Sequence, residues 1–338
     1  MRWFLIVFYA CCIPIGYCSN ANIEAEADSV RQGFTFVVIG DSGQLGSELS
    51  LTSTALRNLI ERERFAFVAM VGDLAYPGGY SSLEDPLFPD LFVKPFSEID
   101  VPFFPVLGDN DYGCDERSSN LNSYLHFDLI EPKWKMENFY YSSIHETGGV
   151  SLCSVFIDTQ SLVLILYPEN RTSEEIDMLS KQIEWLESAL GSSECQNADF
   201  VVVFGHHPLI SASRKGNKGT TSQTLRGILL PLFERFFVDA YFSGHDHDLQ
   251  SLEFEDRDNG HSMSFIVSGS SSRIRTKVFD GPLDGINCWR CVDTIGFTVT
   301  NVSKDEMVTR FVASASGKDI YTHLTKSHRR FRVADGSV

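Results

Sequence analysis

The sequence predicts an α/β protein whose functional residues gather where buried strands end. Five apolar runs stop at a glycine that is followed at once by aspartate or histidine. Open α/β sheets keep their binding sites at the carboxyl ends of strands, and glycine lets the backbone turn tightly there. Segments with helical spacing of apolar residues lie between several of these runs. The runs are residues 34–39 before Gly40-Asp41, 65–71 before Gly72-Asp73, 101–107 before Gly108-Asp109, 200–204 before Gly205-His206 and 238–243 before Gly244-His245.

The first half of the chain alternates strand and helix. Residues 48–63 predict a helix with Leu51, Leu56 and Ile60 on one side. The apolar run 65–71 follows as a strand that is buried on both faces. Pro, Gly and Ser are frequent in residues 77–96, which predicts a loop and then a short helix.

The second half continues the same pattern. Aromatic side chains are frequent in residues 113–150, and we expect them to pack in the core and on strands. Residues 151–166 predict two strands, with residues 156–159 as an inner strand. Further helices are predicted at 173–189 and 222–237, and further strands at 265–269 and 296–301.

Composition limits the function classes. The chain has 338 residues, no long linker and no repeat beyond the strand–glycine pattern, which favours one large domain. Its formal net charge of −17 argues against nucleic-acid binding and against attraction to anionic membranes. An acidic surface is also mildly unfavourable for a phosphate substrate, so bound metals would have to reverse the field locally.

The two ends of the chain are predicted to lie outside the folded domain. Residues 1–18 read as a secretory signal peptide, with a short basic start and an apolar core, although a retained anchor is the alternative. Residues 19–33 read as a flexible acidic segment, residues 34–324 as the domain and residues 325–338 as a basic tail. Outside the signal, no apolar run approaches the about 20 residues of a membrane helix.

Cysteine usage agrees with a secretory route. Three of the eight cysteines lie in the predicted signal, and the remaining five favour disulfides with one left over. Cys288 and Cys291 form a CxxC pair that predicts a local bridge or half of a zinc site. Two N-glycosylation sequons begin at Asn170 and Asn301. The other cysteines are Cys114, Cys153 and Cys195.

The strand-end motifs resemble those of the calcineurin-like metallophosphoesterases. The series reads GDxG, GDxxY, a degenerate GNH[DE], GHHP and GHxH. Tyr76, three residues after Asp73, makes the chain similar to the small purple acid phosphatases over about residues 34–320. The stretch 311–323 also resembles apicomplexan members, which include a phosphatase-like anchor of the glideosome. The resemblance implies two packed mixed β-sheets flanked by helices.

The same resemblance implies a dinuclear metal centre with Asp73 as the bridging ligand. Asp and His are ligands of hard to borderline metals, and a tyrosinate with two carboxylates suits Fe(III). Imidazole with carboxylate suits a divalent partner, which we expect to be Fe(II), Zn or Mn. By resemblance, Asp41, Tyr76 and His247 complete the first site, and Asp109, His206 and His245 complete the second.

Four polar neighbours of these ligands have open roles. His206 and His207 are adjacent on an extended segment and point opposite ways, so only one is a ligand, and the family pattern selects His206. His207 is then a packed or rim residue. Asp246 and Asp248 either orient the histidine ligands or face solvent, and Asp111 is a candidate for a similar supporting role.

The chain departs from the family pattern at two positions. Asp109-Asn110 stands where the family has Asn-His, so a histidine general acid is missing at Asn110. A second family histidine corresponds to Lys215, whose charge can still neutralise phosphate. Losing a general acid costs about 10²–10⁴-fold in rate, which matters least for good leaving groups. We therefore keep Asn110 and Lys215 as candidate catalytic positions.

The resemblance implies a secreted acid phosphatase in which a metal-bound hydroxide attacks a phosphomonoester. Its location would be outside the cell or in the lumen of an acidic or secretory organelle. The alternative is a catalytically weakened, phosphatase-like scaffold that resembles the glideosome anchor and binds a protein partner. A protein Ser/Thr phosphatase or a phosphodiesterase is disfavoured by Tyr76 and by the signal peptide.

Overall fold

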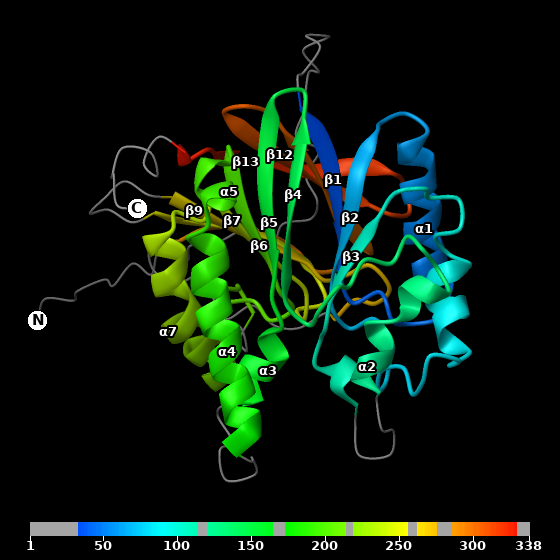
Figure 1. Cartoon of the computed structure of the whole chain (residues 1–338). Helices are drawn as coiled ribbons and strands as arrows, with labels where there is room; N and C mark the ends of the chain where they lie inside the picture. Colours follow the sequence, from blue (N-terminus) through cyan, green and yellow to red (C-terminus); the bar gives the residue numbers. More distant parts are fainter. Residues whose placement is uncertain are drawn as a thin grey trace, which may run out of the picture.

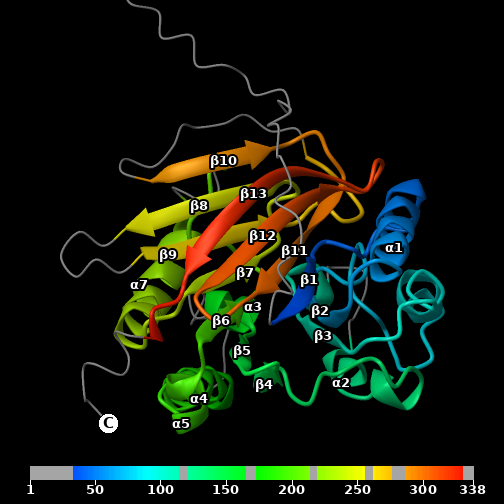
Figure 2. The ribbon, with the colours of Figure 1, turned by 90° about the horizontal axis from the view of Figure 1, so that it is seen from above.

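Two mixed β-sheets pack face to face and carry helices on their outer sides (Figure 1, Figure 2). This computed structural model describes residues 33–113, 120–164, 173–213, 219–255, 262–275 and 286–329. The signal peptide, residues 19–32, Cys114, the Asn170 sequon, Lys215 and most of the basic tail lie outside these ranges. The expected two-sheet architecture is confirmed for the described part of the chain.

The first sheet has the strand order β13-β12-β11-β1-β2-β3. β1, β2 and β3 run parallel, so the three loops that follow them leave from the same edge. β11 to β13 add an antiparallel meander beside β1. The strands are β1 (Phe34–Ile39), β2 (Phe65–Val71), β3 (Phe103–Val106), β11 (Gly296–Val302), β12 (Glu306–Ala313) and β13 (Lys318–Lys326).

The second sheet has the order β10-β8-β9-β7-β6-β5-β4. Its centre, β5, β6, β7 and β9, is parallel, and antiparallel strands flank this centre. The strands are β4 (Tyr141–Thr147), β5 (Val150–Phe156), β6 (Phe200–Phe204), β7 (Ala240–Ser243), β8 (Leu249–Glu255), β9 (Ser262–Ser268) and β10 (Asn287–Cys291).

Helices cover the outer face of each sheet (Figure 1). α1 and α2 lie beside the first sheet, and α4, α5 and α7 lie beside the second. No helix in the described ranges is long and apolar enough to cross a membrane. The helices are α1 (Ser47–Ile60), α2 (Leu121–Tyr124), α3 (Thr159–Val163), α4 (Ser173–Leu190), α5 (Ser193–Asn197) and α7 (Thr220–Arg235), with short turns of helix at Pro89–Val93, Asn110–Tyr112 and Phe127–Leu129.

Phenylalanine rings from both sheets join them into one core. Phe36 of β1 meets the edges of Phe204 and Phe242 of the second sheet, with ring centroids 5.8 and 5.6 Å apart. Such edge-to-face pairs stabilise a core by about 0.5–1.5 kcal/mol each beyond their burial. As expected, the aromatic residues of 120–150 are largely in the core, with Tyr124, Phe127 and Trp134 at 0–1% exposure.

Two local predictions are wrong. Residues 159–163 form α3 instead of a second strand, because Asp158 caps a helix by accepting a hydrogen bond from the Ser161 N–H. In α1, Leu51 is 40% exposed while Leu56 is buried. Five residues along a helix is 500°, so these two leucines face well apart and cannot share one side.

Two of the four described cysteines form a disulfide. Cys153 of β5 forms a disulfide with Cys195 of α5. Cys288 and Cys291 are not joined in a disulfide. They lie on β10, where residues three apart point to opposite faces of the sheet, so the expected local bridge does not form.

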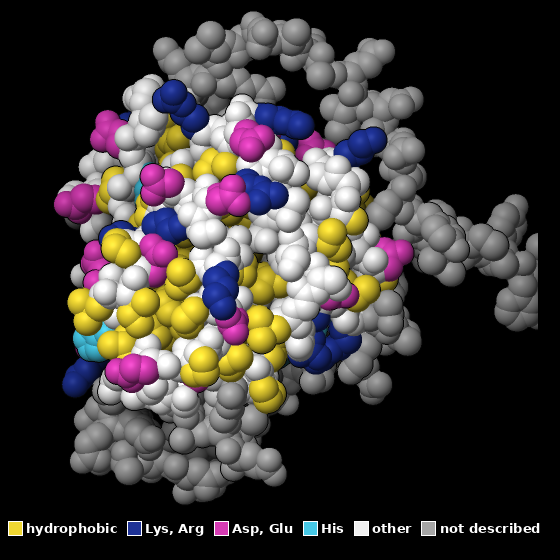
Figure 3. Space-filling view, turned by 90° about the vertical axis from the view of Figure 1, so that its right-hand side faces the viewer, with side chains coloured by type: hydrophobic (Ala, Val, Ile, Leu, Met, Phe, Trp, Pro, Cys, Tyr) yellow, Lys and Arg dark blue, Asp and Glu magenta, His cyan; other side chains and the backbone are white. Residues whose placement is uncertain are grey.

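One outer face carries a mixture of apolar and charged side chains over α1 and α2 (Figure 3). Leu129 is 74% exposed and Ile130 is 46% exposed beside α2, and Leu45 and Leu51 are exposed near α1. Acidic and basic side chains are interspersed among them in this view (Figure 3).

Candidate metal centre

The loops after β1, β2, β3, β6 and β7 meet at one end of the sandwich. Each begins at the carboxyl end of a parallel strand, so the strand order alone brings the loops of one sheet together, and sheet packing brings in the others. The seven ligands expected from the sequence form one connected cluster of side chains. They are Asp41, Asp73, Tyr76, Asp109, His206, His245 and His247.

Tyr76 is the centre of the first group. Its hydroxyl donates to Asp73 Oδ2 at 2.8 Å and lies 3.0 Å from Asp41 Oδ1. His247 Nε2 lies 3.3 Å from the same hydroxyl and 3.1 Å from Asp41 Oδ1. Asp41, Asp73 and His247 are at most 4% exposed. These four side chains therefore converge on one small buried volume.

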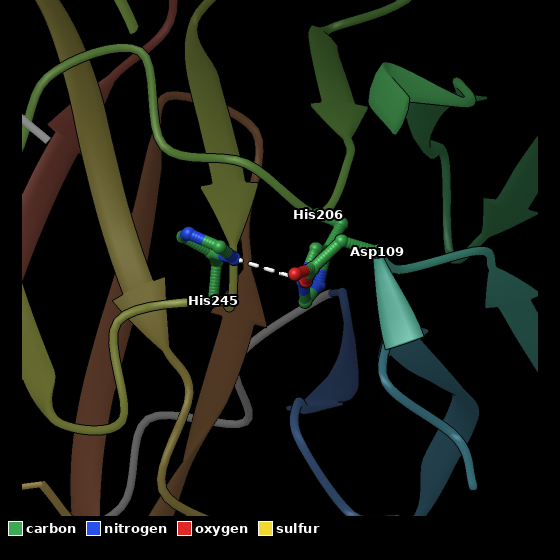
Figure 4. Close-up of side chains that lie close together, drawn as sticks. All are labelled: Asp109, His206 and His245. Atoms are coloured by element: carbon green, nitrogen blue, oxygen red, sulfur yellow. Dashed lines mark hydrogen bonds and ion pairs between the residues drawn. The ribbon is translucent and has the colours of Figure 1, made fainter. Parts of the chain in front are cut away.

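Asp109, His206 and His245 form the second group (Figure 4). Asp109 Oδ1 lies 3.0 Å from His206 Nε2 and 3.2 Å from His245 Nδ1, and the two imidazole nitrogens are 3.3 Å apart. The Asp109 side chain is 38% exposed and that of His245 is 24% exposed. The second group therefore lies at the mouth of the site, and the first lies beneath it.

Asp73 connects the two groups. One of its oxygens accepts from Tyr76, and the other lies 3.4 Å from His206 Nε2. Ligand atoms within 4.8 Å of one another are offered by Asp109, His206 and His245, and again by Asp41, Asp73 and His206. A carboxylate with an oxygen toward each group has the placement that a bridging ligand needs.

The charges of the site suit a cation. Burial, together with the nearby charges of Asp109 and Asp41, raises the pKa of Asp73 to about 6, although His206 opposes this. Burial and the carboxylates of Asp41 and Asp73 also raise the pKa of the Tyr76 phenol above its ordinary value. Anionic forms crowded in this way require a positive charge between them. The Nδ1 atom of His247 is buried with no partner among the described residues. The donor set therefore fits a metal centre.

The backbone adopts unusual conformations where it presents these ligands. Asp41, Asp73 and His245 have φ of 55°, 54° and 65°, in the left-handed region that L-residues seldom occupy. Strain of this kind concentrates at functional sites. Gly72 has φ of 85°, and a Cβ there would lie 2.5 Å from His206 Nδ1. A glycine is therefore required for the β2 loop to pass this close to the ligand.

Asp111 holds two ligand loops together. Its carboxylate accepts from the backbone N–H of Leu74 at 3.0 Å and of Gly108 at 2.8 Å, and from the Tyr124 hydroxyl at 3.0 Å. Leu74 follows Asp73, and Gly108 precedes Asp109. Asp111 therefore acts on the loop backbones and contacts no ligand-type side chain in these bonds, and its supporting role toward a metal stays a prediction.

Asp246 and Asp248 are buried, which excludes the solvent-facing alternative. Asp246 accepts from the hydroxyls of Ser211 and Ser213, and Asp248 pairs with Arg290 at 2.6 Å. Neither carboxylate accepts a recorded hydrogen bond from a histidine ligand. Both instead fix the loops around the site.

His207 is packed, as expected, and its partner was missed by sequence reasoning. Its Nδ1 lies 2.9 Å from the Thr159 hydroxyl, which also accepts from the backbone N–H groups of His206 and His207. Thr159 follows the end of β5. The sequence signal for it was the pair of polar residues, Asp158 and Thr159, that comes after this apolar run. The glycine that marks the other strand ends is absent there.

Asn110 turns toward the bridging carboxylate. Its side-chain amide donates to Asp73 Oδ2 at 2.8 Å, and its backbone N–H donates to Asp73 Oδ1 at 2.9 Å. Lys215 lies outside the described residues. Arg273, which sequence reasoning also missed, places its guanidinium carbon 4.7 Å from the centre of the Tyr76 ring. No strand-end motif precedes Arg273, so the sequence offered no clear signal for it.

Several known proteins are similar to this chain in sequence. The family model for calcineurin-like phosphoesterase matches residues 34–249. Glideosome-associated protein 50 of Plasmodium falciparum is 29% identical over 318 residues, covering 85% of this chain and 75% of that protein. Human tartrate-resistant acid phosphatase type 5 is 27% identical over 335 residues, with 92% and 95% covered. Purple acid phosphatase 3 of Arabidopsis thaliana is 31% identical over 286 residues, with 79% and 72% covered.

Solved structures show the same fold. The Plasmodium GAP50 structure, described as the anchor in the inner membrane complex, superposes with a TM-score of 0.72 at 26% identity, covering 90% of this chain and 95% of that chain. The yellow lupin purple acid phosphatase superposes with a TM-score of 0.64 at 16% identity, covering 88% and 54%. The second likeness concerns the fold alone.

Proposed function

Because this chain belongs to the calcineurin-like phosphoesterase family, we propose that it hydrolyses phosphomonoesters at a dinuclear metal centre. The observation that carries the proposal is the convergence of seven ligand-type side chains around Asp73. The relatives named acid phosphatases support the same reaction class. When bound, two metal ions supply Lewis acidity toward phosphate oxygens and activate water for attack at phosphorus.

We assign two ligand sets that share Asp73. Asp41, Tyr76 and His247 form the buried set, whose oxygen-rich donors suit Fe(III). Asp109, His206 and His245 form the exposed set, which suits Fe(II), Zn or Mn. The exposed set faces the mouth of the site, where a substrate phosphate would enter.

We propose that the residues around the ligands hold the ligand side chains in place and bind the substrate. The Asn110 amide holds Asp73 in place but cannot act as a proton donor to a leaving group as imidazole does. We therefore propose activity on aryl phosphates, whose leaving groups need little protonation, and slower hydrolysis of alkyl phosphates by about 10²–10⁴-fold. Lys215 stays a proposed phosphate-neutralising residue.

We also propose that the protein works in the secretory pathway, outside the cell or in an organelle lumen. The apolar segment after Met1-Arg2 and the Cys153–Cys195 disulfide support this location. A phosphomonoester substrate needs no membrane span or nucleic-acid surface. On the same route we expect glycans at Asn170 and Asn301.

A metal and activity assay on one preparation tests the function. We expect the wild-type protein to bind two metals, to show the visible charge-transfer band of an iron–tyrosinate, and to hydrolyse p-nitrophenyl phosphate at acid pH. Asp73→Asn is expected to lose metal and to lower turnover at least about 10²-fold. Exposed Asp128 provides the matched control, because Asp128→Asn makes the same chemical change at a residue that is not one of the seven ligands. An Asp73→Asn protein with both metals and full activity would refute the assignment.

A non-catalytic scaffold is the second candidate function. Asn110 stands at the position where the family has a histidine, and its amide donates a hydrogen bond to Asp73. The similarity to glideosome-associated protein 50 also supports a scaffold. Metal-loaded protein without turnover would favour this candidate. Asn110→His should then restore hydrolysis if the missing imidazole is the only defect, with Asn110→Gln as the control that keeps an amide.

A further inference from the structure

We propose that Arg273 binds the phosphoryl group at this centre, as a contact between the protein and the substrate anion. The inference rests on the proposed function, because it concerns the same site. Arg273 is partly exposed, and its guanidinium carbon lies 4.7 Å from the centre of the Tyr76 ring. The hydroxyl of that ring touches Asp41 and Asp73. The Tyr76 ring therefore contacts the Arg273 cation with its face and the carboxylates of the ligand cluster with its hydroxyl.

A serine-rich segment fixes the position of Arg273. The Ser272 hydroxyl donates to the carbonyl of Asp41 at 2.5 Å and accepts from the N–H of Gln44 at 3.0 Å. The Ser271 hydroxyl accepts from the N–H of Gly40 at 3.2 Å. Both serines are buried. The backbone that carries Arg273 is thus bonded directly to the loop that carries the ligand Asp41.

The side chain is held by Tyr76 and by no carboxylate. The face of the Tyr76 ring attracts the cation, which orients the side chain without neutralising it. Within the described ranges, no ion pair or hydrogen bond is recorded for the Arg273 guanidinium. Arg290, by contrast, is nearly buried and paired with Asp248 at 2.6 Å. Arg273 thus keeps its charge and its N–H donors available to a ligand.

An anion is the ligand that fits this arrangement. The chain carries a net charge of −17, so a phosphate that approaches the site needs local positive charge. A guanidinium offers two parallel N–H donors that match two phosphate oxygens, which an ammonium group does not. Asn110, which replaces the cationic or proton-donating histidine of the family, donates to Asp73 instead. Arg273 supplies the positive charge that Asn110 lacks.

Binding of inorganic phosphate to the metal-loaded full chain tests the proposal. Arg273→Met keeps an unbranched apolar side chain over Tyr76 and removes the charge and all N–H donors. Charged hydrogen bonds contribute about 1.5–3 kcal/mol, so we expect calorimetry to show phosphate affinity reduced about 10- to 100-fold. Arg273→Lys should recover part of the loss. Exposed Arg64 is the control, since Arg64→Gln also removes one cation and should leave phosphate affinity unchanged.

Metal content and the visible spectrum, measured on the same samples, separate binding from structure. An Arg273→Met protein that keeps both metals but binds phosphate weakly supports the proposal. If it binds phosphate as the wild type does, or if its only change is loss of metal, the proposal is wrong. Wild-type protein that fails to bind millimolar phosphate also overturns it. Wild-type protein that binds phosphate through Arg273 without turnover would refute the proposed hydrolysis and leave this inference standing.

Discussion

At the scale of single residues, His145 is a polar side chain in an apolar environment. It lies on β4 with its ring stacked on Phe67 at 4.1 Å and set against the edge of Phe104 at 5.5 Å. Its Nε2 is buried with no partner among the described residues. Burial lowers the pKa of this imidazole to about 4. The fold therefore favours the neutral form of His145.

We predict that His145 makes the protein less stable in acid. An unfolded histidine has a pKa of about 6.5, so between pH 6.5 and 4 the unfolded state binds more protons, and the free energy of unfolding decreases as the pH is lowered. The loss should reach about 1–2 kcal/mol at pH 5. His145→Phe should remove this part of the pH dependence in urea unfolding at pH 7.5 and 5. Exposed His126 is the control, and an unchanged pH dependence in His145→Phe would contradict the prediction.

The sequence predicted which residues form the site, but it did not predict where their side chains point. The Gly-Asp and Gly-His pairs after apolar runs identified five side chains, and the family resemblance added Tyr76 and His247; the structure brings all seven together. Asn110 was recognised as a departure, yet its bond to Asp73 depends on how the β2 and β3 loops meet. Arg273 is distant in sequence from Tyr76, so only the folded chain shows their contact.

At the scale of elements, the site depends on a bond between loops of adjacent strands. β2 and β3 are parallel neighbours, and Asp111 ties the loop after one to the loop after the other. Both bonds go to backbone N–H groups, so Asp111 fixes the path of each loop and thereby the placement of Asp73 and Asp109. Oδ2 accepts from both N–H groups, at 2.8 Å from Gly108 and 3.2 Å from Leu74, and Oδ1 accepts from Leu74 at 3.0 Å.

We predict that Asp111→Asn weakens metal binding although Asp111 is not a ligand. Asparagine replaces one acceptor oxygen with an N–H₂ group that would face an N–H donor of Leu74 or Gly108. Loss of such supporting bonds costs about 10–100-fold in metal affinity. Chelator competition with the metal-loaded protein measures the change. Tyr124→Phe, which removes a donor to Asp111 but leaves the bonds from Leu74 and Gly108 to Asp111 in place, should have a smaller effect. Equal affinity in Asp111→Asn and wild type would rule out this role.

Helices and strands were predicted correctly where the apolar pattern was long. The prediction failed where a single local hydrogen bond determined the structure. The strands that end in glycine are continuous apolar runs, and all five were found. α3 was missed because its five residues follow an apolar strand directly, and a single capping bond from Asp158 changes the structure. In α1 the helix itself was correct, but the buried side is formed by Leu49, Ala55, Leu56 and Leu59.

At the scale of the whole molecule, fold and charge act in opposite directions on a phosphate substrate. The two sheets bring ligand loops from distant parts of the sequence to one end, and the resemblance to a known family was needed to predict that second sheet. Periodicity identifies strands but does not say which sheets they join. The net charge of −17, in contrast, follows from composition alone and repels anions at long range.

We therefore predict that salt accelerates the proposed reaction. Raising ionic strength from about 0.01 to 0.15 M shortens the Debye length from about 30 to 8 Å, which screens the acidic surface but not contacts within the site. The kcat/KM for p-nitrophenyl phosphate should rise about two- to tenfold, because steering effects of charge act on association. Bis(p-nitrophenyl) phosphate carries one negative charge instead of two and should show a weaker dependence. A fall in kcat/KM with rising salt would contradict this prediction. It would mean that attraction of the substrate by positive charge at the mouth, including Arg273, is stronger than repulsion by the rest of the acidic surface.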